Sequence, residues 1–104
     1  MKNKTKCKCV NYDYSDLIEL LKAISESNRL QIICFLKEKE RCVCEIIEAL
    51  HIQPNLASHH LKALKNIGLL LSRRKGKYIF YKINNKRLNY FLGHFRKVVR
   101  GEKE

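Results

Sequence analysis

The stretch that decides the fold is CVCEIIEALHIQPNLASHHLKALKN, which occupies residues 42–66. Apolar residues recur at helical spacing in its first part, at Val43, Ile46, Ile47 and Leu50. This spacing predicts a helix that begins near Cys42. A second helix is predicted over Pro54–Asn66, because the missing N–H of proline would be unpaired at the first helical position anyway. Only residues 51–53 separate the two helices, so the stretch predicts a helix-turn-helix.

Apolar spacing and turn residues also predict helices and strands on either side of this stretch. Upstream, the spacing of Leu17, Leu20, Leu21 and Ile24 predicts an amphipathic helix of about ten residues. A second helix is predicted to open at Ser27 or Asn28. The second is expected to bury Leu30, Ile33, Cys34 and Leu36. Downstream, Leu69–Arg74 and Lys77–Ile83 predict two strands of a tight hairpin. A last amphipathic helix is expected from Leu88, Phe91, Leu92, Phe95 and Val99. The fold class is therefore mainly α (α+β), a winged helix-turn-helix with four helices, a hairpin wing and a C-terminal helix.

Length and charge favour a single nucleic-acid-binding domain. Among the 104 residues, 1–13 are expected to form a flexible basic tail that carries Cys7 and Cys9, and 14–104 a single domain. Lys and Arg total 22 against 10 Asp and Glu, so the formal charge of +12 indicates a polyanionic partner. No apolar run is long enough to span a membrane, and the basic N-terminus lacks the apolar stretch of a signal peptide. We expect a cytoplasmic protein.

The predicted helix Pro54–Asn66 has one face suited to base edges in a major groove. Helical spacing places on that face Asn55, Ser58, His59, Lys62 and Asn66. The face holds short hydrogen-bonding groups and a cation but no carboxylate, so we expect it to contact DNA together with Gln53 at the helix cap. The opposite side is expected to pack through Leu56, Leu61 and Leu64. His60 lies at the border and is expected to be a structural histidine.

The hairpin adds a cluster of cations beside this helix. Arg73, Arg74, Lys75 and Lys77 fall within a short segment around the turn. Guanidinium and ammonium groups so placed are suited to DNA phosphates next to the groove.

The cysteines suggest a thiolate site. The chain has five, an odd number that argues for reduced thiols in a protein without an export signal. Cys42 and Cys44 would face opposite ways on a regular helix, so they can share an ion only if the helix starts at or after Cys42 or if its first turn distorts. Cys7 and Cys9 offer further donors. Three or four thiolates suit a soft ion such as As(III), Sb(III), Cd(II), Pb(II) or Zn(II). Cys34, on an apolar stripe, is expected to be buried.

Residues 27–83 resemble the ArsR/SmtB family of metal-sensing repressors. The resemblance rests on Arg29-Leu30, on Cys42-Val43-Cys44-Glu45, on Ala57-Ser58-His59-His60-Leu61, and on Arg73-Arg74-Lys75-Gly76-Lys77 with Tyr81. It implies a homodimer whose first and last helices form the interface, and release from DNA when inducer binds. It also implies that Cys42 and Cys44 hold the inducer, with Cys7 and Cys9 from the tail as in the cadmium/lead branch. The family's second site on the last helix is not matched by Asn84-Asn85-Lys86-Arg87.

The sequence thus predicts a metal(loid)-responsive repressor that binds double-stranded operator DNA as a homodimer. The alternative is a winged-helix regulator that has no ligand or that responds to thiol oxidation, with the cysteines incidental or redox-active. An enzyme is not expected, because no Gly-rich phosphate loop and no pairing of a nucleophile with a base is present. No organic cofactor, small-molecule substrate or membrane partner is expected either.

Overall fold

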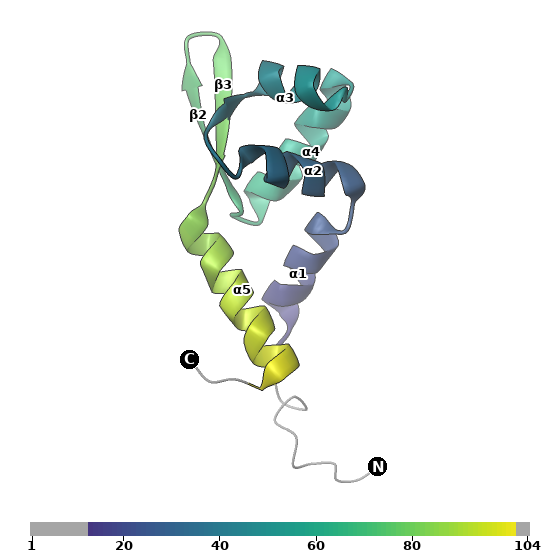
Figure 1. Cartoon of the computed structure of the whole chain (residues 1–104), viewed down its shortest axis with the longest axis vertical. Helices are drawn as coiled ribbons and strands as arrows, with labels where there is room; N and C mark the ends of the chain where they lie inside the picture. Colours follow the sequence, from purple (N-terminus) through teal and green to yellow (C-terminus); the bar gives the residue numbers. More distant parts are fainter. Residues whose placement is uncertain (1–12, 102–104) are drawn as a thin grey trace.

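The computed structural model describes residues 13–101, and the expected tail with Cys7 and Cys9 lies outside them except for Asp13 (Figure 1). The elements are α1 (Ser15–Ile24), α2 (Ser27–Leu36), β1 (Arg41–Cys42), α3 (Val43–Leu50), α4 (Pro54–Asn66), β2 (Leu70–Lys75), β3 (Tyr78–Ile83) and α5 (Asn85–Arg100). The predicted winged helix-turn-helix is confirmed, and the short strand β1 is an addition that the sequence did not reveal. No helix within the described residues combines the length and the apolar character that crossing a membrane requires.

The helix-turn-helix follows the predicted boundaries closely. α3 ends at Leu50, and its C-cap His51 adopts a left-handed conformation with φ of 54° and donates its N–H to the carbonyl of Ile47. Ile52 is buried in the turn, and Gln53 is the N-cap of α4, which begins at Pro54. A left-handed residue ends a helix abruptly and a proline fits the first helical turn, so this sequence sets the short separation between α3 and α4.

The sheet is antiparallel with strand order β1-β3-β2. The first strand of the hairpin is shifted by one residue from its prediction, and the second begins one residue later and ends at Ile83 as predicted. Gly76 has a φ of +62° in the turn, a conformation that glycine adopts without strain. The central strand β3 pairs with β1 through Cys42 and Phe80. This pairing ties the start of α3, and with it a cysteine, to the wing.

The core lies between α1, α2, α3, α4, the base of the hairpin and the part of α5 that carries Phe91. Its most deeply buried side chains include Ile32, Ile46, Leu61, Leu64, Leu69, Leu70 and Phe91. Leu61 and Leu64 are buried as predicted, whereas the prediction for Leu56 is wrong, because that side chain is 46% exposed. Ala57, one position further and so about 100° around the helix, is buried in its place.

The predicted inward face of α2 is also wrong in part. Ile32 and Leu36 are buried, while Leu30 is exposed and Ile33 only partly covered. Cys34 is likewise exposed, and therefore does not act as a buried apolar residue. The apolar residues of α2 surround the helix, so spacing alone did not distinguish the two sides.

Helices α1 and α5 converge at the end of the molecule opposite the tip of the wing (Figure 1). They carry several of the exposed large apolar side chains: Ile18, Leu21, Tyr90, Leu92, Phe95 and Val99. Phe91 of α5, by contrast, is fully buried in the core. The last amphipathic helix is therefore present, but its apolar positions divide between the core and the surface.

Candidate nucleic-acid interface and cysteine pair

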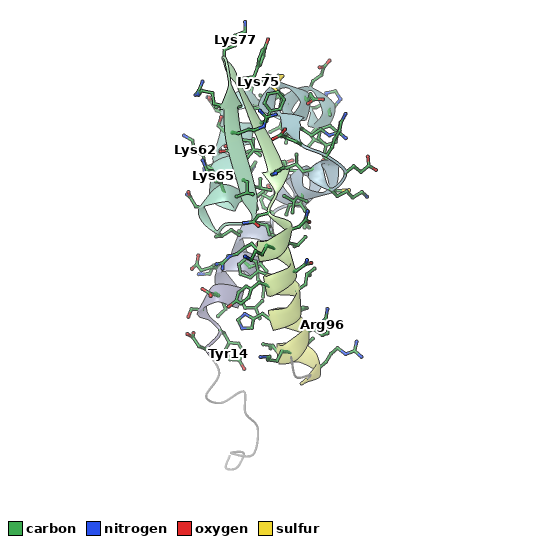
Figure 2. All side chains as sticks on the ribbon, turned by 90° about the vertical axis from the view of Figure 1, so that its left-hand side faces the viewer. Tyr14, Lys62, Lys65, Lys75, Lys77 and Arg96 are labelled. Carbon is green, nitrogen blue, oxygen red and sulfur yellow. A yellow bond between two sulfur atoms is a disulfide. The ribbon has the colours of Figure 1, made fainter. Side chains whose placement is uncertain are left out.

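The predicted DNA-reading face of α4 is exposed throughout. Every side chain assigned to it points away from the core: Asn55, Ser58, His59, Lys62 and Asn66, with Gln53 at the cap. The opposite side packs on the core through Ala57, His60, Leu61 and Leu64. Figure 2 shows Lys62 and Lys65 projecting from α4 along the same edge of the molecule. Lys65 was not predicted, although its position three residues after Lys62 on an exposed helix could have suggested it.

The hairpin presents Arg74, Lys75 and Lys77 to solvent, with Lys75 and Lys77 near its tip (Figure 2). Arg73 differs, because its Nε and Nη2 each donate to a carboxylate oxygen of Glu40 at 2.8 Å, and its guanidinium lies over the Phe80 ring. The hydrogen bond from Arg73 lowers the pKa of Glu40, and the same bond raises the pKa of Arg73. The charge of Arg73 is thus already neutralised within the protomer.

The side chains of Cys42 and Cys44 lie close together because α3 begins at Val43, so that Cys42 precedes the helix. Cys42 is the N-cap of α3 and has an extended backbone (φ −71°, ψ 148°). The two cysteine side chains therefore do not face opposite ways, as they would on a regular helix. Its N–H donates to Glu45 Oε1 at 2.9 Å, and its sulfur accepts from the Cys44 N–H at 3.3 Å. The expected condition for a shared site, a helix start after Cys42, is met. A helix start also favours thiolate over thiol.

The two sulfurs are joined as a disulfide, with their Cα atoms 5.2 Å apart, whereas reduced thiols were expected. The pair is therefore close enough for either bond formation or a shared ligand. Within residues 13–101, no three His, Cys, Asp or Glu side chains are grouped so that they could hold a metal. Cys7 and Cys9 lie outside the described residues, so a site with more than two thiolates would need donors from there.

A pocket of about 330 Å³ connects the cysteine pair to the predicted DNA contacts. Its lining comes from the start of α3, from α4 and from the wing: Cys42, Val43, Cys44, Ile47, Ser58, Leu61, Lys62, Lys77, Tyr78, Ile79 and Tyr81. Ser58 and Lys62 belong to the DNA-reading face, and Lys77 belongs to the wing. A ligand bound to the sulfurs would therefore share walls with groups from both predicted DNA-contacting elements.

His60 is buried, as expected for a structural histidine. Its Nδ1 accepts a hydrogen bond from Arg29 Nε at 3.0 Å, and its Nε2 lies 3.7 Å from Glu26 Oε1. Burial lowers the pKa of His60, and the charge of Arg29 and the neighbouring His59 lower it further, against the opposing effect of Glu26. Arg29 was noted in the sequence only as part of the motif, and its contact with α4 was not foreseen.

Known proteins resemble this chain in both sequence and fold. Residues 26–72 match the family model described as bacterial regulatory protein, arsR family. The cadmium resistance transcriptional regulatory protein CadC of Listeria innocua is 36% identical over 84 residues, which cover 80% of this chain and 71% of that protein. The arsenical resistance operon repressor of Staphylococcus xylosus is 32% identical over 77 residues, 74% of each chain. Reduced HlyU from Vibrio cholerae superposes with a TM-score of 0.72 at 25% identity, covering 89% of this chain and 98% of that one.

Proposed function

Because this chain belongs to the arsR family of bacterial regulatory proteins, which are transcriptional regulators and not enzymes, we propose that it is a metal(loid)-responsive repressor of a resistance operon. It binds operator DNA in the cytoplasm as a homodimer and is released when a thiophilic ion binds its cysteine thiolates. The candidate ions are As(III), Sb(III), Cd(II), Pb(II) and Zn(II). The names of relatives refer to cadmium and arsenical resistance, which supports this range.

DNA reading is assigned to α4 and the wing. In the proposed complex α4 enters the major groove, where Asn55, Ser58, His59 and Lys62 contact base edges. Gln53 lies at the cap on the same side. The wing contacts phosphates through Arg74, Lys75 and Lys77, and Arg73 joins them only if its ion pair with Glu40 opens.

Dimerisation is assigned to α1 and α5. Leu92 is 50% exposed, Phe95 41% and Val99 58%, and Ile18 and Leu21 add exposed apolar surface on α1. Exposed apolar side chains gathered on two helices are typical of a protein–protein interface. Pairing through these helices would leave both copies of α4 free to contact successive turns of one DNA face.

The observation that carries the proposed response is the shared pocket of the cysteine pair, Ser58, Lys62 and Lys77. When reduced, Cys42 and Cys44 supply two soft donors, and we assign the remaining donors to Cys7 and Cys9. An ion bound there would lie against the wall formed by α4 and the wing. A coupling of 1–3 kcal/mol lowers DNA affinity by about 5- to 150-fold, and DNA must weaken ion binding by the same factor.

A second candidate function is a thiol-redox switch, which is supported by the disulfide between Cys42 and Cys44. Oxidation would consume the same sulfurs that an ion needs, so the two responses exclude each other at this site. The metal response is preferred because of the named roles of the relatives.

The test is a DNA-binding titration of the reduced, full-length protein under anaerobic conditions. A labelled duplex selected by the protein from a random library is titrated, and its fluorescence anisotropy is followed with and without each ion. At least one ion should release the wild-type protein, whereas Cys42→Ser with Cys44→Ser should remain bound. Cys34→Ser is the matched control, because Cys34 is exposed and does not line the pocket. An unchanged ion response in the double variant would contradict the site, and release by peroxide but by no ion would favour the redox switch.

A further inference from the structure

One guanidinium contacts two adjacent histidines of α4. Arg29 of α2 donates from Nε to His60 Nδ1 at 3.0 Å, and its Nη2 lies 3.5 Å from His59 Nε2. Its Nη1 donates to the carbonyl of Ala23 at the end of α1, at 3.2 Å. Arg29 therefore links α1, α2 and the DNA-reading helix through a single side chain.

The chemistry of arginine determines which ring nitrogen carries the proton. A guanidinium has only donors, so each histidine nitrogen that faces it must offer a lone pair. His60 therefore has its proton on Nε2, the nitrogen that lies toward Glu26 Oε1. By the same reasoning His59 accepts at Nε2, so that in the neutral ring the proton is on Nδ1.

The two histidines differ in exposure, and therefore in the acceptor to which the protonated ring nitrogen of each can donate. His60 is 5% exposed, and its donor is directed within the protein toward Glu26. His59 is exposed and shares the face of Asn55, Ser58 and Lys62. Its Nδ1–H is the ring donor that remains for a partner outside the protein.

We propose that Arg29 is a specificity-determining positioning residue, which holds His59 as the Nδ1–H tautomer so that it selects a base with an acceptor in the major groove. Guanine (N7 and O6), adenine (N7) and thymine (O4) meet this requirement, whereas cytosine presents an amino donor. The inference rests on the proposed reading of DNA by α4. To that proposal it adds the class of base that His59 selects at one position, and it assigns a role in this selection to Arg29, which does not itself touch DNA.

The first test measures the tautomer directly. In long-range ¹H–¹⁵N spectra of the full-length protein at neutral pH, His59 Nδ1 should show the shift of a protonated ring nitrogen and Nε2 that of an unprotonated one. In Arg29→Lys, which keeps the charge but lacks the fork that spans both rings, this preference should weaken. A wild-type protein whose His59 carries its proton on Nε2 would overturn the proposal without any DNA.

The second test measures base preference by selection from a random duplex library. The wild-type protein should disfavour cytosine at one position of each half-site by about 2- to 10-fold, the contribution of one hydrogen bond. His59→Ala should abolish the preference at that position, Arg29→Lys should weaken it, and both should leave the other positions intact. The double variant should lose no more preference than His59→Ala alone, because both residues act through one contact.

The outcomes separate this inference from the function on which it rests. If Arg29 only supported the fold, Arg29→Lys would weaken binding at all positions alike, and this result, or an unchanged preference, would overturn the positioning role. If the wild-type protein selected no sequence, the proposed DNA reading would itself be wrong. His59→Ala keeps the Arg29–His60 contact, so it tests the base contact even if the Arg29 variant is less stable.

Discussion

Removing the carboxylate of Glu40 should strengthen DNA binding. Glu40 holds Arg73 through two hydrogen bonds of 2.8 Å, and Arg73 emerges from the same hairpin as Arg74 and Lys75. Glu40→Gln keeps the shape of the side chain but removes its charge. The variant therefore releases a guanidinium for the DNA and removes one source of repulsion from the phosphates.

The size of the effect follows from counterion release. Each cation that neutralises a phosphate contributes about −0.9 to the slope of log K against log salt concentration. Glu40→Gln should make the slope steeper by up to about 0.9 per protomer, or about 1.8 for a dimer. Lys77→Gln should make it shallower by about the same amount, equal to about 3.5-fold per protomer between 50 and 200 mM salt. Arg73→Gln should leave the slope nearly unchanged, since that charge is already paired.

The assay is fluorescence anisotropy with one selected duplex at several salt concentrations, with the reduced protein and no added ion. Lys77→Gln is the matched comparison for Arg73→Gln, because each removes one cation from the wing. A slope that falls equally in Arg73→Gln and Lys77→Gln, with no change in Glu40→Gln, would refute the reasoning. That result would mean that Arg73 exchanges its partner for a phosphate when DNA binds.

Three further predictions concern stability and assembly. Leu64→Ala should lower the free energy of unfolding by about 2–5 kcal/mol, because Leu64 is fully buried, and urea denaturation will show this as a lower midpoint with unchanged slope. Burial lowers the pKa of His60, so the unfolded chain takes up a proton more readily than the folded one. Stability should therefore fall as the pH drops below about 6.5, the ordinary histidine value, and His60→Gln should flatten that part of a curve measured from pH 8 to 5. Phe95→Glu should convert the proposed homodimer to a folded monomer in sedimentation velocity runs, and a sedimentation coefficient equal to that of the wild type would exclude α5 from the proposed interface.

The parts of the fold that depend on neighbouring residues were predictable from the sequence. His51-Ile52-Gln53-Pro54 marks the turn because local backbone chemistry ends one helix and begins the next. The face of α4 was predicted because its polar residues cluster on one side of the helix. In α2 apolar residues occur all around, so only the packed structure distinguishes buried Ile32 from exposed Leu30.

The features that join distant residues were not predictable. Arg73 and Glu40 are 33 positions apart, and Arg29 lies 31 positions from His60, so no periodicity connects them. The same holds for the pairing of Cys42 with Phe80 in the sheet, which brings the cysteine pair to the wing. The thiolate site was expected from residue type and stays a prediction, whereas the pocket that the cysteines share with α4 depends on the tertiary fold.

The most direct test of the central claim is one anaerobic titration followed by two signals. The reduced protein on its selected duplex receives a thiophilic ion while thiolate–metal absorption and DNA anisotropy are recorded together. The account predicts that both signals change over the same equivalents of ion, and that Cys42→Ser with Cys44→Ser loses both while Cys34→Ser keeps both. Full growth of the absorption band with the protein still bound to DNA, for each ion in turn, would contradict it.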